Sequence, residues 1–177
     1  MTVKREERRQ DLNQFTIRTI GYLKSEHCNP QDTPIQPRFA QECKGYVEIF
    51  PEFEKGLKDI ETFSHIILLY YFNKAAKPEL ISKPFLEDTA HGVFATRLPS
   101  RPNAIGLSIV KLIDRKRNIL NISGVDILND TPVIDIKPYI PRFDCINDSG
   151  NGWLEKIDNE TADQRGKRGY INKGNAQ

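Results

Sequence analysis

Residues 106–140 read GLSIVKLIDRKRNILNISGVDILNDTPVIDIKPYI, and this stretch decides the fold. Its apolar residues recur at every second position in three runs, 106–115, 118–128 and 132–140, which is the period of β-strands. Short polar or proline-containing turns separate the runs. The stretch therefore predicts three strands in succession.

The same pattern extends toward the N-terminus. Further strands are predicted at 15–23, 45–50, 64–72 and 92–97. The run 64–72 is apolar throughout, as expected of a strand that is covered on both faces. A helical segment is predicted at 51–63, because Phe53, Leu57 and Ile60 lie at i, i+4 and i+7. Short strands with one or two short helices predict a mainly β protein, either a barrel or a sandwich.

The chain has 177 residues, which is about the length of a single domain. Its ends differ from its middle, because they are polar and have no apolar period. We therefore predict a flexible N-terminal segment at 1–14, an ordered β domain at 15–157 and a flexible C-terminal tail at 158–177.

Charge and cysteine content narrow the functional class. Lys and Arg number 26 against 24 Asp and Glu, for a net charge of +2, which argues against polybasic nucleic-acid binding. Locally, however, 97–117 holds six basic residues against Asp114 alone, so a basic edge for RNA is predicted. Three scattered cysteines, with neither a signal peptide nor a membrane-length apolar run, predict a cytoplasmic protein with no membrane association.

Two loops have the composition of binding sites. In DTPIQPR (32–38), prolines on both sides of Gln36 stiffen a loop that could read a planar heterocycle by amide hydrogen bonds. The alternative is a plain connector between strands. In 91–108, a predicted strand and a proline-bounded turn carry Arg97, Arg101 and Asn103, and two guanidinium groups suit carboxylate or phosphate. The alternatives are a solvated surface and salt bridges to Glu87 or Asp88.

A third constellation lies near the end of the domain. Asp135, Lys137 and Tyr139 share one face of a predicted strand and could transfer protons, although an ordinary charge ladder would look the same. No metal site is predicted, because neither the aspartates at 126–135 nor His27 with Cys28 and Cys43 has the regular spacing of a calcium or zinc site.

Nucleotide-binding fingerprints are absent from the sequence. It has no G-x-G-x-x-G after a strand, no G-x-x-x-x-G-K-[ST] and no βαβ rhythm. A Rossmann-type cofactor domain and a P-loop nucleotidase are therefore not predicted.

Four stretches together resemble the TsaA-like (TrmO) family of S-adenosylmethionine-dependent tRNA methyltransferases. They are PIQPR, VEIFPEFEKGLKDIETFSHIILLYYF, VFATRLPSRPNAIGLS and DILNDTPVIDIKPYIP, and the resemblance covers about 15–157. It implies a small single-domain β-barrel methyltransferase that is not of the Rossmann type. It also implies methylation of N6 of threonylcarbamoyladenosine at position 37 of tRNA-Thr, contact with the anticodon loop, and a homodimer.

The resemblance also implies a site, carried over position by position. The cofactor S-adenosylmethionine would contact Pro34, Ile35, Gln36, Asn73, Lys74, Arg97, Leu107, Asp126, Ile127, Leu128 and Asn129. The other site residues are predicted from their own chemistry and not from the resemblance. Arg101 and Asn103 would bind the modified base or its threonyl carboxylate, and Asp135, Lys137 and Tyr139 would be the catalytic group. The chain departs from the family pattern at Asn73-Lys74, where many relatives have His-Gln, and at Asp130, where relatives usually have Gly.

Two other functions remain open at this stage. One is a non-catalytic RNA-binding β-barrel, which would bind RNA through basic loops and exposed aromatic side chains without any cofactor. The other is a methyltransferase of the same fold that acts on a substrate other than tRNA. Binding of S-adenosylmethionine separates the first alternative from the methyltransferases.

Overall fold

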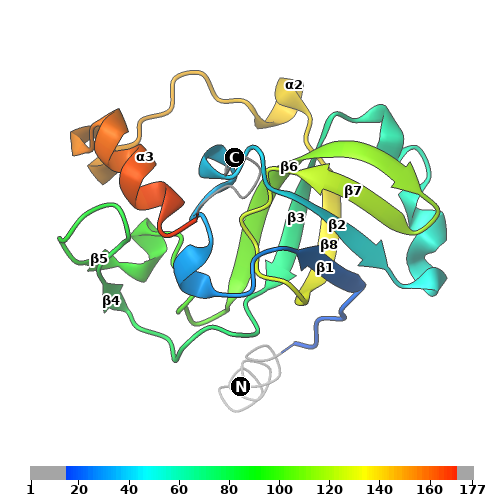
Figure 1. Ribbon diagram of the computed structural model, residues 1–177, viewed down its shortest axis with the longest axis horizontal. Coiled ribbons are helices and arrows are strands. Elements are labelled where there is room, and N and C mark those ends of the chain that lie inside the picture. The colour runs from blue at the N-terminus through cyan, green and yellow to red at the C-terminus, as the bar shows by residue number, and fades with distance from the viewer. Residues whose placement is uncertain (1–14, 171–177) are drawn as a thin grey trace, which may run out of the picture.

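The computed structural model describes residues 15–170. Within that part of the chain, six strands close a barrel in the order β1-β2-β7-β6-β3-β8, and β4 and β5 form a separate two-stranded ribbon (Figure 1). All neighbouring strands of the barrel are antiparallel. The prediction of a mainly β protein with a small barrel is confirmed, and the sandwich is excluded.

Most of the predicted strands are present, and most helices are short. The strands are β1 (Gly21–Ser25), β2 (Lys44–Ile49), β3 (His65–Tyr71), β4 (Ile81–Ser82), β5 (His91–Gly92), β6 (Ile105–Lys116), β7 (Ile119–Ser123) and β8 (Thr131–Pro138). The α-helices within the described residues are α2 (Pro141–Asp144) and α3 (Asn159–Lys167). Short 3-10 helices occupy Pro30–Asp32, Pro37–Phe39, Pro51–Leu57, Ile60–Thr62, Val93–Ala95 and Gly152–Lys156.

The core fills the inside of the barrel. On β3, Ile66, Leu68 and Tyr70 are buried, whereas Tyr71 is 49% exposed. The prediction that 64–72 is covered on both faces was therefore wrong. A closed barrel has one packed interior, so the alternate side chains of β3 face outward and stay partly accessible.

The predicted helical segment is present as two 3-10 helices, Pro51–Leu57 and Ile60–Thr62. Leu57 is buried, and Phe53 and Ile60 pack against the core, as their spacing predicted. The segment 92–97 differs from its prediction as a strand, because Val93–Ala95 is a 3-10 helix. Both the backbone N–H and the hydroxyl of Thr96 donate to the carbonyl oxygen of Val93, so local hydrogen bonds replace strand pairing there.

The C-terminal segment, which was predicted as a flexible tail, contains the helix α3. Asp158 caps α3 by accepting a hydrogen bond from the backbone N–H of Thr161 at 2.8 Å. At the other end of this helix, a Cβ on Gly166 would meet the ring of Phe39 at 2.5 Å, and the carbonyl oxygen of Gly166 accepts from the N–H of Ile35 at 2.9 Å. The helix α3 therefore contacts the connection between β1 and β2. The predicted flexible segment 1–14 and the last seven residues, 171–177, lie outside the described part of the chain.

Antiparallel order brings three long connections to one end of the barrel. The connections 26–43, 72–104 and 124–130 all begin where a strand reaches this end, and each returns into the barrel from there (Figure 1). We call this the loop end. The opposite end holds the 51–63 segment and the β6–β7 hairpin. In residues 15–170, no helix is long and apolar enough to cross a membrane.

Candidate cofactor-binding site

The loop end gathers nearly all of the predicted cofactor residues. Because the three connections meet there, segments distant in sequence are brought together. These residues are Pro34, Ile35 and Gln36 from the first connection, Asn73, Lys74 and Arg97 from the second, and Asp126, Ile127, Leu128 and Asn129 from the third.

A direct hydrogen bond joins the first two connections. The Nη1 of Arg97 donates to the Oε1 of Gln36 at 2.7 Å. The backbone is fixed on both sides of Gln36. Pro34 is fully buried, and Pro37 begins a 3-10 helix. The two prolines therefore act as the sequence predicted, by fixing the backbone on either side of the amide.

A polar chain runs from the third connection into the barrel. The hydroxyl of Ser108 donates to the Oδ1 of Asp126 at 2.7 Å, and the Oγ of Ser108 lies 3.0 Å from the hydroxyl of Tyr70. Burial raises the pKa of Asp126 to about 7, although the Ser108 hydrogen bond and the charge of Arg97 act to lower it. Burial also raises the pKa of Tyr70 above its ordinary value, with a further contribution from Asp126. Asp126 is thus the acidic group at this end that changes protonation near neutral pH.

The connection 124–130 is tied firmly to β1. The Oγ of Ser25 donates to the carbonyl oxygen of Ile127 at 2.7 Å, and the N–H of Asn129 donates to that of His27 at 2.7 Å. Lys74 reaches the same loop, with its Nζ 3.3 Å from the carbonyl oxygen of Asn129. The second and third connections are therefore also in contact.

Asp130 adopts a backbone conformation that suits glycine, the residue that the family resemblance implies at this position. Its φ is +63°, in the left-handed region that glycine adopts without cost. The Asp130 carboxylate forms an ion pair with Lys24 of β1, which offsets part of that backbone cost. The departure from the family pattern is therefore accommodated locally.

The predicted substrate residues line an open pocket of about 630 Å³ beside Asn73. Asn103 is exposed there, whereas the Nη1 of Arg101 donates to the carbonyl oxygens of Thr96 and Leu98 at 3.2 and 3.4 Å. Arg101 therefore stabilises the turn to which it belongs. Neither arginine of this loop pairs with the two carboxylates that the sequence offered as partners. Glu87 binds His91 at 2.6 Å, and Asp88 binds Arg165 at 3.2 Å.

The structure places the remaining predicted residues on the outer wall of the barrel. Leu107 points outward and is 48% exposed. Asp135 and Lys137 form an exposed ion pair at 2.6 Å, and Tyr139 lies beside His65, the first residue of β3, at the end opposite the loops. Within one chain, the predicted catalytic group is therefore not brought to the loop end.

The predicted basic edge is also divided. Arg97 belongs to the loop end, whereas Arg115 and Arg117 lie at the far end of the 12-residue strand β6, about 35 Å along the strand. Arg115 is committed to structure, because it donates to the carbonyl oxygens of Leu57 and Arg117 and pairs with Glu61. The positive residues of 97–117 therefore do not form one patch.

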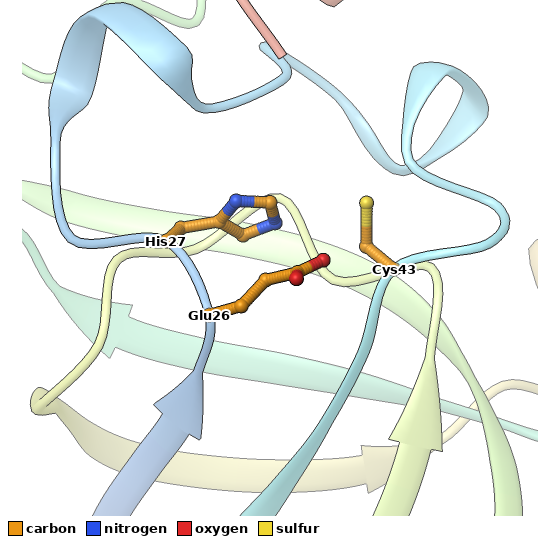
Figure 2. Close-up of side chains that lie close together, drawn as sticks. All are labelled: Glu26, His27 and Cys43. Atoms are coloured by element: carbon orange, nitrogen blue, oxygen red, sulfur yellow. The ribbon is translucent and has the colours of Figure 1, made fainter. Parts of the chain in front are cut away.

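A second polar group lies at the loop end. Glu26, His27 and Cys43 converge there (Figure 2), with one ligand-type atom of each within 4.8 Å of the others. The Nε2 of His27 lies 2.8 Å from the carbonyl oxygen of Val125, and the hydroxyl of Tyr170 donates to Glu26 at 2.8 Å. Burial raises the pKa of the Cys43 thiol. The hydrogen bond from Tyr170 to Glu26 attaches the segment after α3 to the barrel.

Ser108 and Tyr70, which are hydrogen-bonded in line with Asp126, and Tyr170, which is hydrogen-bonded to Glu26, were not among the predicted site residues. A signal for Ser108 existed, because it is a polar residue at an inward position of a strand that otherwise places Gly106, Val110 and Leu112 inside. Tyr170 had no such signal, since it follows a polar stretch with no apolar period.

A closed barrel of six antiparallel strands with loops tethered at one end defines a small β-barrel, outside the Rossmann class. Comparison with known proteins then identifies its family. The family described as "tRNA-methyltransferase O N-terminal domain" matches residues 22–145, and the chain belongs to this TrmO family of S-adenosylmethionine-dependent tRNA adenine-N6 methyltransferases. The resemblance seen in the sequence is confirmed.

Relatives are found in archaea, bacteria and animals. The chain is 54% identical over 139 residues to a "Probable S-adenosyl-L-methionine-binding protein" of Pyrococcus abyssi, covering 78% of this chain and 76% of that one. It is 38% identical over 132 residues to the Homo sapiens "tRNA (adenine(37)-N6)-methyltransferase", covering 71% of this chain and 30% of the human protein. A solved TrmO from Pseudomonas aeruginosa superposes with a TM-score of 0.67 at 37% identity, covering 79% of this chain and 62% of that chain.

Proposed function

We propose that this protein transfers a methyl group from S-adenosylmethionine to N6 of threonylcarbamoyladenosine at position 37 of tRNA-Thr. One observation carries the proposal: the loops with Gln36, Arg97 and Asp126 meet at one barrel end and contact one another. Family membership supports it, since relatives are named as S-adenosylmethionine-binding proteins and as tRNA methyltransferases. The chain spans 30% of the human relative, so that protein's activity comes to this chain as a proposal.

The residues of the loop end fit the proposed cofactor. The Gln36 amide and the backbone of 126–129 offer hydrogen bonds for an adenine edge, and partly accessible Ile35 and Leu128 offer apolar surface. When bound, S-adenosylmethionine would supply an electrophilic methyl group. The protein's own part is to orient the reacting nitrogen and to accept its proton.

For the substrate, we propose that Asn103 and the guanidinium of Arg101 contact the modified base or its threonyl carboxylate. Both line the open pocket next to Asn73. The Asp135, Lys137 and Tyr139 group stays a catalytic prediction from the sequence. Its place on the outer wall means that it could act only on a substrate approaching that wall.

The same outer wall supports the proposed homodimer. Leu69 of β3 is paired with Leu107 of β6, and Ile67 with Ile109, so apolar side chains adjoin there. Leu107 is 48% and Ile109 37% exposed. Light scattering of the wild type and of Leu107→Glu tests this contact, with a monomeric variant expected. The cytoplasm remains the predicted location.

The decisive experiment is in vitro methylation with labelled S-adenosylmethionine. Threonylcarbamoylated tRNA-Thr should accept the label at N6, and the same tRNA without the threonylcarbamoyl group should not. Calorimetry with the cofactor alone accompanies it. A protein that binds RNA but not the cofactor would be an RNA-binding barrel. A protein that binds the cofactor but leaves tRNA unlabelled would be a methyltransferase with another substrate.

A further inference from the structure

The polar chain Asp126–Ser108–Tyr70 is unusual for its surroundings. The barrel interior around it is apolar, with Leu68 and Val110 completely or almost completely buried on the neighbouring strands. A buried polar chain is retained only when all of its members are hydrogen-bonded, and an apolar replacement is often no less stable. Packing of the barrel core therefore does not explain why the polar residues Asp126, Ser108 and Tyr70 are present.

The carboxyl group of Asp126 has the features of a proton acceptor. It belongs to the connection that the family resemblance assigns to the cofactor, yet its side chain turns to Ser108 of the barrel wall. Arg97 is near enough for its charge to act on Asp126, and Arg97 also holds Gln36. Asp126 keeps some accessible surface, so a proton taken up there can later leave to water.

We propose that Asp126 is the general base of the methyl transfer, and that Ser108 is the positioning residue that orients its carboxylate. This inference rests on the proposed function and deepens it. The reacting N6 carries one hydrogen and a carbamoyl group, so it is a poor nucleophile and a comparatively good acid. As the bond from N6 to the methyl carbon forms, the bond from sulfur to that carbon breaks. The N6 proton passes to Asp126, and the thioether leaves uncharged.

The protonation behaviour of this group agrees with such a role. Burial raises the pKa of Asp126 to about 7, so near neutral pH an appreciable fraction is ionised and able to accept a proton. A general base is most effective when its pKa lies close to the working pH. Asp135, by contrast, is exposed and already paired with Lys137 on the outer wall.

The test uses the full chain, threonylcarbamoylated tRNA-Thr and three variants. Asp126→Asn should lower kcat by about 10²–10⁴-fold and abolish the fall of kcat on the acid side of the pH profile. Its affinity for S-adenosylmethionine, measured by calorimetry, should stay within about threefold of the wild type. Asp148→Asn is the matched control, because Asp148 is an exposed aspartate outside the site, and it should behave as wild type.

Ser108→Ala tests the geometry without removing the base. Losing the Ser108 hydrogen bond should raise the pKa of Asp126 further, so the acid limb of the kcat profile should move to higher pH while activity survives. An independent readout is the ¹³C NMR titration of side-chain carboxyl groups. One resonance should titrate near pH 7 in the wild type, be absent in Asp126→Asn and shift upward in Ser108→Ala.

The outcomes separate this inference from the proposed function. A wild type that transfers no methyl group overturns the proposed function, and the inference with it. A wild type that is active while Asp126→Asn keeps its kcat and acid limb overturns the inference alone. An Asp126→Asn variant that loses cofactor affinity but keeps its pH profile also overturns it, and assigns the carboxylate to the positive charge of the cofactor.

Discussion

Burial raises a pKa in each of two polar groups at the loop end, with opposite consequences near neutral pH. In the Asp126–Ser108–Tyr70 chain, burial raises the pKa of an aspartic acid, whose ordinary value is 3.8, to about 7. In the Glu26–His27–Cys43 group, burial raises the pKa of a thiol whose ordinary value is already 9.0. Desolvation therefore brings the pKa of the aspartic acid into the neutral range and moves the pKa of the thiol further above it.

This difference in pKa distinguishes a group that can react near neutral pH from a group with a structural role. Tyr170 completes the second group, and desolvation raises the pKa of its phenol above the ordinary value, so thiol and phenol both stay protonated and uncharged. The hydroxyl of Tyr170 donates to Glu26, and this hydrogen bond holds the C-terminal segment against the barrel. Figure 2 shows Glu26 beside His27 and Cys43. Asp126, by contrast, has a pKa raised to about 7, so it can exchange a proton near neutral pH. Four predictions test this comparison.

The largest effect is expected on the pH dependence of stability. Because the folded-state pKa of Asp126 is raised, the folded protein binds one more proton than the unfolded chain between about pH 4 and pH 7. Its contribution to the free energy of unfolding is therefore fully present below pH 4 and is lost as pH rises through 7. Relative to the wild type, Asp126→Asn should gain about 4 kcal/mol of stability between pH 4 and pH 8, because each unit by which the pKa is raised corresponds to about 1.4 kcal/mol.

Urea unfolding at several pH values measures this difference. The comparison with the variant is necessary because Glu155 and Asp158 act in the other direction. Hydrogen bonds to Asn151 and Thr161 lower the pKa values of these two carboxyl groups, so their contributions to stability are lost toward acid pH. A difference between wild type and variant that does not change with pH would mean that Asp126 is ionised normally.

The next effect concerns cofactor binding at Arg97. Replacing Arg97 with Ala removes the hydrogen bond to Gln36 and a positive charge near Asp126. The dissociation constant for S-adenosylmethionine should rise about tenfold or more, since a hydrogen bond to a charged group contributes about 1.5–3 kcal/mol. Calorimetry measures it, with exposed Arg142→Ala as the control. Wild-type affinity in Arg97→Ala would remove Arg97 from the cofactor site.

The strands and the loop-end residues show which features of the protein could be predicted from its sequence. The period-two pattern of 106–140 predicted β6, β7 and β8, because each inward position of a barrel strand must be apolar or satisfied. The individual loops were also predictable, since proline beside Gln36 and arginine after a turn have local causes. Their meeting at one end was not, because it follows from the strand order, which only the pairing of distant segments determines.

The features that were not predicted from the sequence also have specific physical reasons. The link from Asp126 to Ser108 and Tyr70 depends on the register between β3 and β6, which pairs Tyr70 with Gly106. Gly106 is required there, because a Cβ would meet the ring of Tyr70 at 2.2 Å. The helix α3 was missed because its attachment is one of shape, with Gly166 against the ring of Phe39, and leaves no apolar period in the sequence.

A smaller effect is expected at Tyr170. The change to Phe keeps the ring next to His27 and removes the hydroxyl that donates to Glu26. The free energy of unfolding should fall by about 1 kcal/mol, the usual contribution of one hydrogen bond, while cofactor affinity stays unchanged. Tyr22→Phe, with an exposed ring on β1, is the control. A large loss of cofactor affinity in Tyr170→Phe would make the second group part of the site.

The smallest effect should follow removal of the ion pair on the outer wall. Lys137 and Asp135 are 59% and 43% exposed, and such pairs contribute between nothing and about 1 kcal/mol. Lys137→Ala and Asp135→Asn should therefore change stability by less than about 0.5 kcal/mol and leave kcat within about twofold of the wild type. Steady-state methylation assays at saturating tRNA measure the rate. A tenfold fall in kcat with unchanged cofactor affinity would restore the sequence-based catalytic group. It would also mean that the nucleobase to be methylated approaches the outer wall of the barrel. Asp126 would then contact the cofactor and would not be the general base.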